Sequence, residues 1–270
     1  MTTFLLFPTP LPTMKAALLV SGLFLSFSMM AQAQQTGKPE DTEVWEPVPK
    51  TVTASPNLAP PPSDAVVLFN GQDLSPWVST ENRTAPAKWQ VAGGLLTVDK
   101  KAGNIETRQT FTNYQLHLEW RIPAGMRETG QSRGNSGVFL ASIGKGDLGY
   151  ELQILDSYQN KTYVNGMAGS IYKQHIPLAN PARKPGEWQS YDVLWTAPVF
   201  KADGSLQAPA RVTVWFNGVV VQNNTVLAGP TQYIGKPSYQ QAHGPSPIKL
   251  QAHGDPSAPI SFRNIWVRKL

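Results

Sequence analysis

The chain has 270 residues and a formal net charge of +5, and its basic residues are scattered without the runs that bind nucleic acid. Charged residues make up only 15% of the chain, whereas amides, Gly, Pro and aromatic residues are abundant. That composition is closer to a sugar-handling β protein than to a nucleic-acid binder. The chain has no cysteine, which excludes a disulfide framework.

Residues 1–33 predict a signal peptide. Met14 and Lys15 precede an apolar run, 16–30, which is followed by Ala31-Gln32-Ala33, an A-x-A cleavage site. The run is shorter than the roughly 20 residues of a membrane span, so we expect cleavage after Ala33 rather than the alternative, an uncleaved anchor. Met14 is a more natural start than Met1.

Export without disulfides predicts a bacterial periplasmic or extracellular location. A lipoprotein needs a cysteine at its processing site, so we expect no membrane anchor after signal cleavage. Residues 34–64 are rich in Pro, Thr and Ser, which is typical of an extended arm. Trp45 within the arm predicts that it lies against the domain surface.

Residues 65–270 predict one all-β domain. Turn signals separate short apolar or alternating runs, and no amphipathic helical pattern of useful length follows residue 64. The spacing is typical of a sandwich or jelly roll. The expected strands are 65–68, a hairpin 89–98 around Gly93-Gly94, 111–123, 136–140, 150–155, 193–195, a hairpin 212–221 around Asn217-Gly218, 248–253 and 260–267.

Three of these strands each present a polar side. Side chains alternate along a strand, so each polar set shares one face. If the strands are neighbours, their polar side chains converge on one concave face; the alternative is an ordinary solvated face of an antiparallel sheet. The sets are His117, Glu119 and Arg121; Glu151 and Gln153; and Lys249, Gln251 and His253.

At these residues the chain resembles the 3-keto-disaccharide hydrolase domain family. The resemblance is carried, over nearly the whole of the mature chain, by LFNGQDL (68–74) with Trp77, RGNSGVF (133–139), YELQILD (150–156), GEW (186–188), LQAHG (250–254) and FRNIW (262–266). It implies a concanavalin A-like jelly roll of two antiparallel sheets. It also implies an exported enzyme that acts on 3-keto-glycosides, so the expected partner is a small carbohydrate.

Glucanases with that fold use a Glu-x-Asp-x-x-Glu strand motif. Here the corresponding line reads Glu151-x-Gln153-x-x-Asp156, and the amide of Gln153 cannot ionise. Hydrolysis by two carboxylates is therefore in doubt. A 3-keto group instead acidifies the C2 proton, so a base can expel the C1 substituent by elimination, and water can then add to the enone.

This route assigns roles to residues of the three polar strands and their turns. Glu151 or His253 is the expected base, and Asp156 or Glu119 the expected acid. Arg133 or Arg263 is expected to stabilise the enolate. The expected substrate-binding residues are Arg133, Asn135, Gln153, Tyr172, Gln251, Arg263 and Arg121.

Other functions stay open. His117 and His253 with Glu119 and Glu151 could bind a divalent metal that polarises the keto group, although no cofactor is certain. Ser136 is not in a nucleophile elbow motif. The alternatives to the keto-sugar enzyme are a non-catalytic, lectin-like jelly roll and a conventional glucanase.

Overall fold

The computed structural model describes residues 37–49, 51 and 61–270. The expected signal peptide lies outside the described residues. In the described part, fifteen strands accompany three 3-10 helices of at most four residues, and no helix is long and apolar enough to cross a membrane. The elements are η1 Pro39–Thr42, β1 Val66–Phe69, β2 Trp77–Ser79, β3 Gln90–Ala92, β4 Leu95–Thr97, β5 Ile105–Thr107, β6 Tyr114–Arg121, η2 Gly130–Ser132, β7 Ser136–Ser142, β8 Gly149–Ile154, η3 Val164–Gly166, β9 Gln189–Thr196, β10 Val199–Phe200, β11 Leu206–Ala208, β12 Arg211–Phe216, β13 Val219–Val226, β14 Lys249–Leu250 and β15 Ser261–Lys269.

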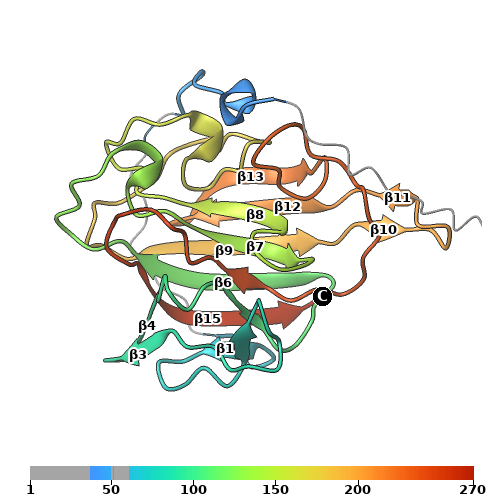
Figure 1. The fold of residues 1–270 in the computed structure, drawn as a ribbon, viewed down its shortest axis with the longest axis horizontal. Coiled ribbons are helices and arrows are strands. Elements are labelled where there is room, and N and C mark those ends of the chain that lie inside the picture. The colour runs from blue at the N-terminus through green and yellow to red at the C-terminus, as the bar shows by residue number, and fades with distance from the viewer. Residues whose placement is uncertain (1–36, 50, 52–60) are drawn as a thin grey trace, which may run out of the picture. The chain divides into compact units, whose positions relative to one another are not determined.

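The strands form two main antiparallel sheets. The larger has eight strands in the order β13-β12-β9-β6-β15-β4-β3, with β1 also paired to β15. The smaller has five, in the order β2-β5-β14-β7-β8. In Figure 1, β13, β12, β9, β6 and β15 follow one another across the larger sheet, while β7 and β8 are drawn in front of it. A separate two-stranded hairpin joins β10 to β11.

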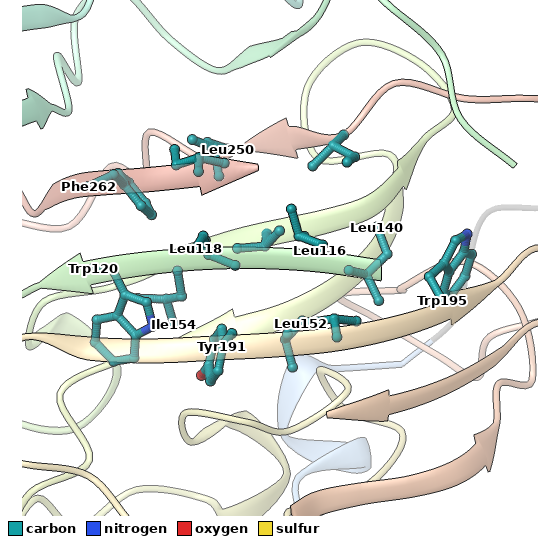
Figure 2. Close-up of a cluster of buried hydrophobic side chains, with 14 of the residues drawn as sticks. Leu116, Leu118, Trp120, Leu140, Leu152, Ile154, Tyr191, Trp195, Leu250 and Phe262 are labelled. Atoms are coloured by element: carbon teal, nitrogen blue, oxygen red, sulfur yellow. The ribbon is translucent and has the colours of Figure 1, made fainter. Parts of the chain in front are cut away.

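The hydrophobic core lies between the two sheets (Figure 2). From the larger sheet β6 contributes Leu116, Leu118 and Trp120, and from the smaller sheet β8 contributes Leu152 and Ile154, all at most 1% exposed. These side chains alternate with polar ones, so each strand turns one face to the core. Replacing Trp120 by Ala would cost about 3–5 kcal/mol of unfolding free energy.

Hydrogen bonds also cross the core. The hydroxyl of Tyr191 on β9 donates to the carbonyl of Gln153 on β8 over 2.6 Å, and that of Tyr114 on β6 donates to the Leu140 carbonyl on β7. Each bond satisfies a buried hydroxyl and ties one sheet to the other. The result is the expected jelly-roll sandwich.

Both predicted hairpins are confirmed, as β3–β4 and β12–β13. The expected strand 248–253 is wrong in length, because regular pairing ends at Leu250. The expected convergence of three polar strands is also wrong, because β6 belongs to the larger sheet, whereas β8 and β14 belong to the smaller. Since both sheets turn their apolar sides to a shared core, their polar sides face in opposite directions.

Candidate functional site

A small pocket lies on the outer face of the five-stranded sheet, opposite the core. Its volume is about 120 Å³, below the roughly 300–1,000 Å³ of drug-sized ligand sites, so it suits one small polar ring rather than a polymer chain. It is lined by Asn135, Asp147, Glu151, Gln153, Tyr172, Thr231, Tyr233, Gln251 and His253.

Strand β8 supplies the floor of the pocket. Leu152 and Ile154 pack into the core, so Glu151 and Gln153 project to the outer face. On β7, Gly137 is paired with Gln153, and a Cβ at that glycine would meet Glu151 Oε1. The Glu151 carboxylate therefore lies over that part of the β7 backbone, and a larger residue at position 137 would displace it.

Glu151 is buried without a partner for its carboxylate. Its backbone N–H donates to Thr231 Oγ1 over 3.0 Å, but its carboxylate accepts no hydrogen bond from any described residue. Burial raises the pKa of Glu151 to about 8; the negative charge of Asp147 adds to this, and Lys249 opposes it. At neutral pH the Glu151 carboxyl group is therefore protonated and can donate a proton to a ligand.

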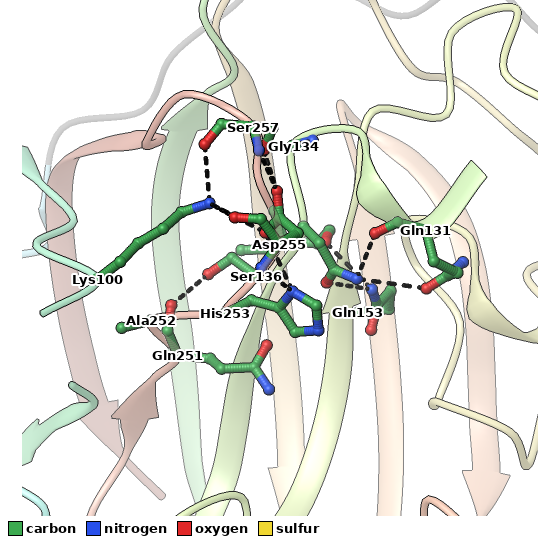
Figure 3. Close-up of polar contacts among 12 residues, drawn as sticks. Lys100, Gln131, Gly134, Ser136, Gln153, Gln251, Ala252, His253, Asp255 and Ser257 are labelled. Carbon is green, nitrogen blue, oxygen red and sulfur yellow. Dashed lines mark hydrogen bonds and ion pairs between the residues drawn. The ribbon is translucent and has the colours of Figure 1, made fainter. Parts of the chain in front are cut away.

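A chain of amides fixes Gln153 beside Glu151. Gln153 Nε2 donates to Asn135 Oδ1 over 2.9 Å, and Asn135 Nδ2 donates to the Gln131 carbonyl over 2.9 Å (Figure 3). This leaves Gln153 Oε1 buried without a hydrogen bond, and Gln251 Oε1 is in the same state. Buried acceptors without partners are rare and costly, so both oxygens are suited to accept hydrogen bonds from ligand hydroxyl groups.

His253 lines the pocket with a ring that is held by a carboxylate. Its Nδ1 lies 3.0 Å from Asp255 Oδ2, which fixes the ring (Figure 3). Asp255 is 3.1 Å from Lys100 Nζ and accepts from the backbone N–H of Ser257 over 2.9 Å. Burial pushes the pKa of Asp255 up, but the hydrogen bonds from His253, Ser257 and Lys100 outweigh it and hold the pKa near 2. Asp255 is therefore a permanent anion that orients the imidazole.

Lys249, expected on the polar face, is fully buried and does not line the pocket. Its Nζ donates to the carbonyls of Gly144, Gly146 and Leu148 over 2.7–2.9 Å. These bonds hold the β7–β8 loop that carries Asp147 to the pocket. Burial lowers the pKa of Lys249 to about 8, against the raising effect of nearby carboxylates such as Glu106.

Three of the expected site residues lie on the opposite face of the sandwich. Glu119 on β6 is 2.6 Å from Arg263 Nε on β15, and Arg263 and Arg121 both stack on Trp188, at 4.0 and 4.7 Å from the ring centroid. Asp156, just after β8, pairs at 2.7 Å with Arg133, just before β7, and neither lines the pocket. None of the three expected arginines therefore lines the pocket.

The metal site considered above is not formed by those residues. His117 and Glu119 belong to the larger sheet, and His253 and Glu151 to the pocket on the smaller one, so the four cannot share one ion. Among the described residues, no group of three or more His, Cys, Asp or Glu side chains is placed to hold a metal.

Sequence reasoning found six of the nine pocket residues and missed Asp147, Thr231 and Tyr233. All three lie in loops, where alternation gives no signal. The Asp147 loop shows only a Gly- and Lys-rich turn, and 231–233 shows nothing beyond a Gly-Pro turn before it.

A comparison with protein families identifies the family of the chain. A model described as a 3-keto-alpha-glucoside-1,2-lyase-like domain matches residues 64–268, which is most of the chain. The chain belongs to this family. The expected resemblance is thereby confirmed.

Solved structures agree with the family. A candidate glycosyl hydrolase from Parabacteroides distasonis is 51% identical, covers 88% of this chain and 100% of its own, and superposes with a TM-score of 0.74. A second from the same organism is 21% identical, covers 76% and 94%, and has a TM-score of 0.55, which shows the fold alone. No curated protein matches significantly. The chain is thus similar to carbohydrate-active enzymes, and the family implies a sugar substrate.

Proposed function

We propose that this protein is an exported enzyme that cleaves the glycosidic bond of 3-keto-glycosides by elimination followed by hydration. The observation that carries the proposal is the pair formed by a protonated carboxyl group, Glu151, and an imidazole held by an anion, His253, in a pocket of about 120 Å³. Acid–base catalysis needs one group that donates a proton and one that accepts it, and these two residues share the pocket.

In the first half-reaction His253 removes the proton from C2, next to the C3 carbonyl. The C2–H electrons form the C1=C2 double bond, the C1–O bond breaks, and the leaving oxygen takes the proton of Glu151. His253 is then protonated and Glu151 ionised. The Asp255 carboxylate, whose Oδ2 lies 3.0 Å from His253 Nδ1, stabilises the imidazolium that forms.

The second half-reaction reverses these roles. The Glu151 carboxylate takes a proton from water as the water oxygen bonds to C1, and protonated His253 returns a proton to C2. Both residues regain their initial states, so the net reaction is hydrolysis. The acceptors Gln153 Oε1 and Gln251 Oε1 bind ring hydroxyl groups, and Tyr172 and Tyr233 form an aromatic wall against which a sugar can pack.

This assignment departs from the sequence-based roles in two places. The acid is Glu151 rather than Asp156 or Glu119, because Asp156 is paired with Arg133 and Glu119 lies on the other face. Arg133 and Arg263 do not line the pocket, so neutral groups would stabilise the enolate oxygen. The Thr231 hydroxyl and the Gln251 amide, which line the pocket, are the donors proposed for this role.

The decisive experiment incubates the purified protein with 3-keto-trehalose, 3-keto-sucrose and their unoxidised parents in D2O, with and without a chelator. We expect cleavage of the keto sugars alone, with deuterium incorporated at C2 of the released 3-keto-glucose. Cleavage of the parents alone would reject the keto-sugar activity. Binding without cleavage of any sugar would indicate a lectin-like module.

A second candidate is ordinary hydrolysis by two carboxylates, because Asp147 shares the pocket with Glu151 and raises its pKa. In that case the parents are cleaved without deuterium at C2, and Asp147→Asn abolishes turnover. For elimination, Asp147→Asn lowers turnover only modestly, since it lowers the pKa of Glu151.

A further inference from the structure

The N-terminal arm is bound to the segment that follows the pocket strand. The backbone N–H of Val164 donates to the Val44 carbonyl over 2.6 Å. The side chain of Asn165, 2% exposed, accepts from the Val44 N–H over 3.0 Å and donates to the Thr42 carbonyl over 2.9 Å. One buried amide thus satisfies two backbone groups of the arm, which is a specific attachment and not a loose surface contact.

Lys173 connects the arm to one pocket tyrosine. Its Nζ donates to the carbonyl of Pro39 over 2.6 Å and to that of Tyr233 over 3.0 Å, and it lies 4.8 Å from the centre of the Tyr233 ring. The side chain is 7% exposed, and the backbone is in the left-handed region at φ +56°, which is unfavourable for lysine. The lysine is therefore held by its surroundings in a strained position, between the arm and the pocket wall.

An aromatic chain connects the arm to the other pocket tyrosine. Trp45 packs edge-on against Tyr163 at 6.2 Å, and the Tyr163 and Tyr172 hydroxyl groups are 2.7 Å apart. The backbone N–H of Tyr172 donates to the Glu151 carbonyl over 3.1 Å. Arm, aromatic wall and the strand of Glu151 are thus in continuous contact.

We infer that residues 37–45 are part of the substrate site, as a positioning element that fixes Tyr172 and Tyr233 against the bound sugar. The arm lies before residue 64, where the family model begins, so this role belongs to the chain and not to the matched domain. The inference rests on the proposed function for the identity of the sugar. The arm residues are positioning residues, because they act through the two tyrosines and do not line the pocket.

The test uses full-length variants altered in the arm alone. Val44→Pro removes the backbone N–H that donates a hydrogen bond to the Asn165 side chain, and Trp45→Ala removes the ring packed on Tyr163. Val48→Ala, at a position 63% exposed, is the matched control. For 3-keto-trehalose we expect KM to rise about tenfold in both arm variants, with kcat within twofold and an unchanged melting temperature, and no change in the control. An unchanged KM in both arm variants would overturn the inference.

Hydrogen exchange without any ligand gives a readout that does not depend on the substrate. The backbone N–H groups of Tyr172, Lys173 and Thr231 are hydrogen-bonded, and we expect at least tenfold faster exchange at residues 163–175 and 229–235 in the arm variants. Unchanged exchange would show that the arm does not hold the wall. If the arm variants exchange faster but the wild type turns over no keto sugar, the proposed function fails while the arm's structural role stands.

Discussion

The two outer faces of the sandwich each carry a buried glutamate next to a histidine, with opposite electrostatic outcomes. Glu119 is 1% exposed; it accepts from Arg263 and Asn264 over 2.6 and 2.8 Å and lies 3.5 Å from His117. Burial alone would raise its pKa, but these bonds outweigh burial and the pKa is lowered. The Glu151 carboxylate accepts no hydrogen bond from the part of the chain that the structure describes, and its pKa rises to about 8.

The histidines differ in the same way. His117 is buried between Asp192 (2.7 Å) and Glu119 and stacks on Trp266; burial lowers its pKa, but the two carboxylates overcome this and raise it to about 9. His253 has one carboxylate partner, Asp255, and a ring that reaches the pocket. A satisfied ionic network rigidifies the protein, whereas an unsatisfied group at a cavity is available to a substrate.

The largest effect expected is on catalysis in Glu151→Gln. The amide keeps the shape of the protonated carboxyl group but cannot donate the proton that the leaving oxygen needs, so kcat should fall about 10³-fold. Steady-state turnover of 3-keto-trehalose is the measurement. Glu119→Gln is the matched control and should stay within threefold of the wild type at 20 °C. Equal losses in both variants would contradict the contrast between the faces.

The reverse contrast is expected for stability. Glu119→Gln removes the buried counter-charge of Arg263 and one of the two carboxylates beside His117, so the free energy of unfolding should fall by about 2–3 kcal/mol at pH 7. Urea denaturation measures the change. Glu151→Gln should lose nothing in the same assay, because it replaces a carboxyl group that is already neutral. If the free energy of unfolding fell by less than about 0.5 kcal/mol in Glu119→Gln, the structural role of Glu119 would be contradicted.

Asp255→Asn compares the two histidine–carboxylate pairs. The amide retains the size of Asp255 but not the charge that stabilises the His253 imidazolium, so we expect kcat to fall about 30-fold. Asp192→Asn makes the same change beside His117 and should leave kcat unaltered. A drop in both would mean that the loss reflects general destabilisation.

Gly137→Ala tests the space over β7. The added methyl group would meet the Glu151 carboxylate and displace it, so kcat should fall about tenfold while the far-UV circular dichroism stays native. The control is Ala141→Gly, which changes the same strand without touching Glu151 and should keep wild-type kcat. Gly146→Ala is not used, because Gly146 has a positive φ. Wild-type activity in Gly137→Ala would mean that the carboxylate does not need its present position.

A pH dependence of known sign, small near neutral pH, completes the comparison. Catalysis requires protonated Glu151, so kcat/KM should fall as the pH rises through about 8, by about tenfold for each further unit. The Glu119→Gln variant should show the same alkaline limb, because its carboxylate is on the other face. Activity that rises through pH 8 would instead make Glu151 the base.

The sequence by itself determined the all-β fold, both hairpins and most of the pocket. Alternation along β8 places Glu151 and Gln153 on one face, and this depends only on the local geometry of a strand. The identity of residue 153 showed that an amide stands where glucanases of this fold have a carboxylate. The motifs that resemble the family contain Asn135, Gln251 and His253.

Only the tertiary structure decided which strands share a sheet. Alternation shows that β6 has one polar side, but whether that side joins β8 depends on pairing between strands distant in sequence. The sequence therefore predicted Glu119 and Arg263 as site residues, but in the structure they form an ion pair on the opposite face. The loop residues Asp147, Thr231 and Tyr233, and the docking of the arm through Lys173, likewise depend on contacts between distant segments. So does the protonation of Glu151, because burial and the absence of partners are properties of the folded chain.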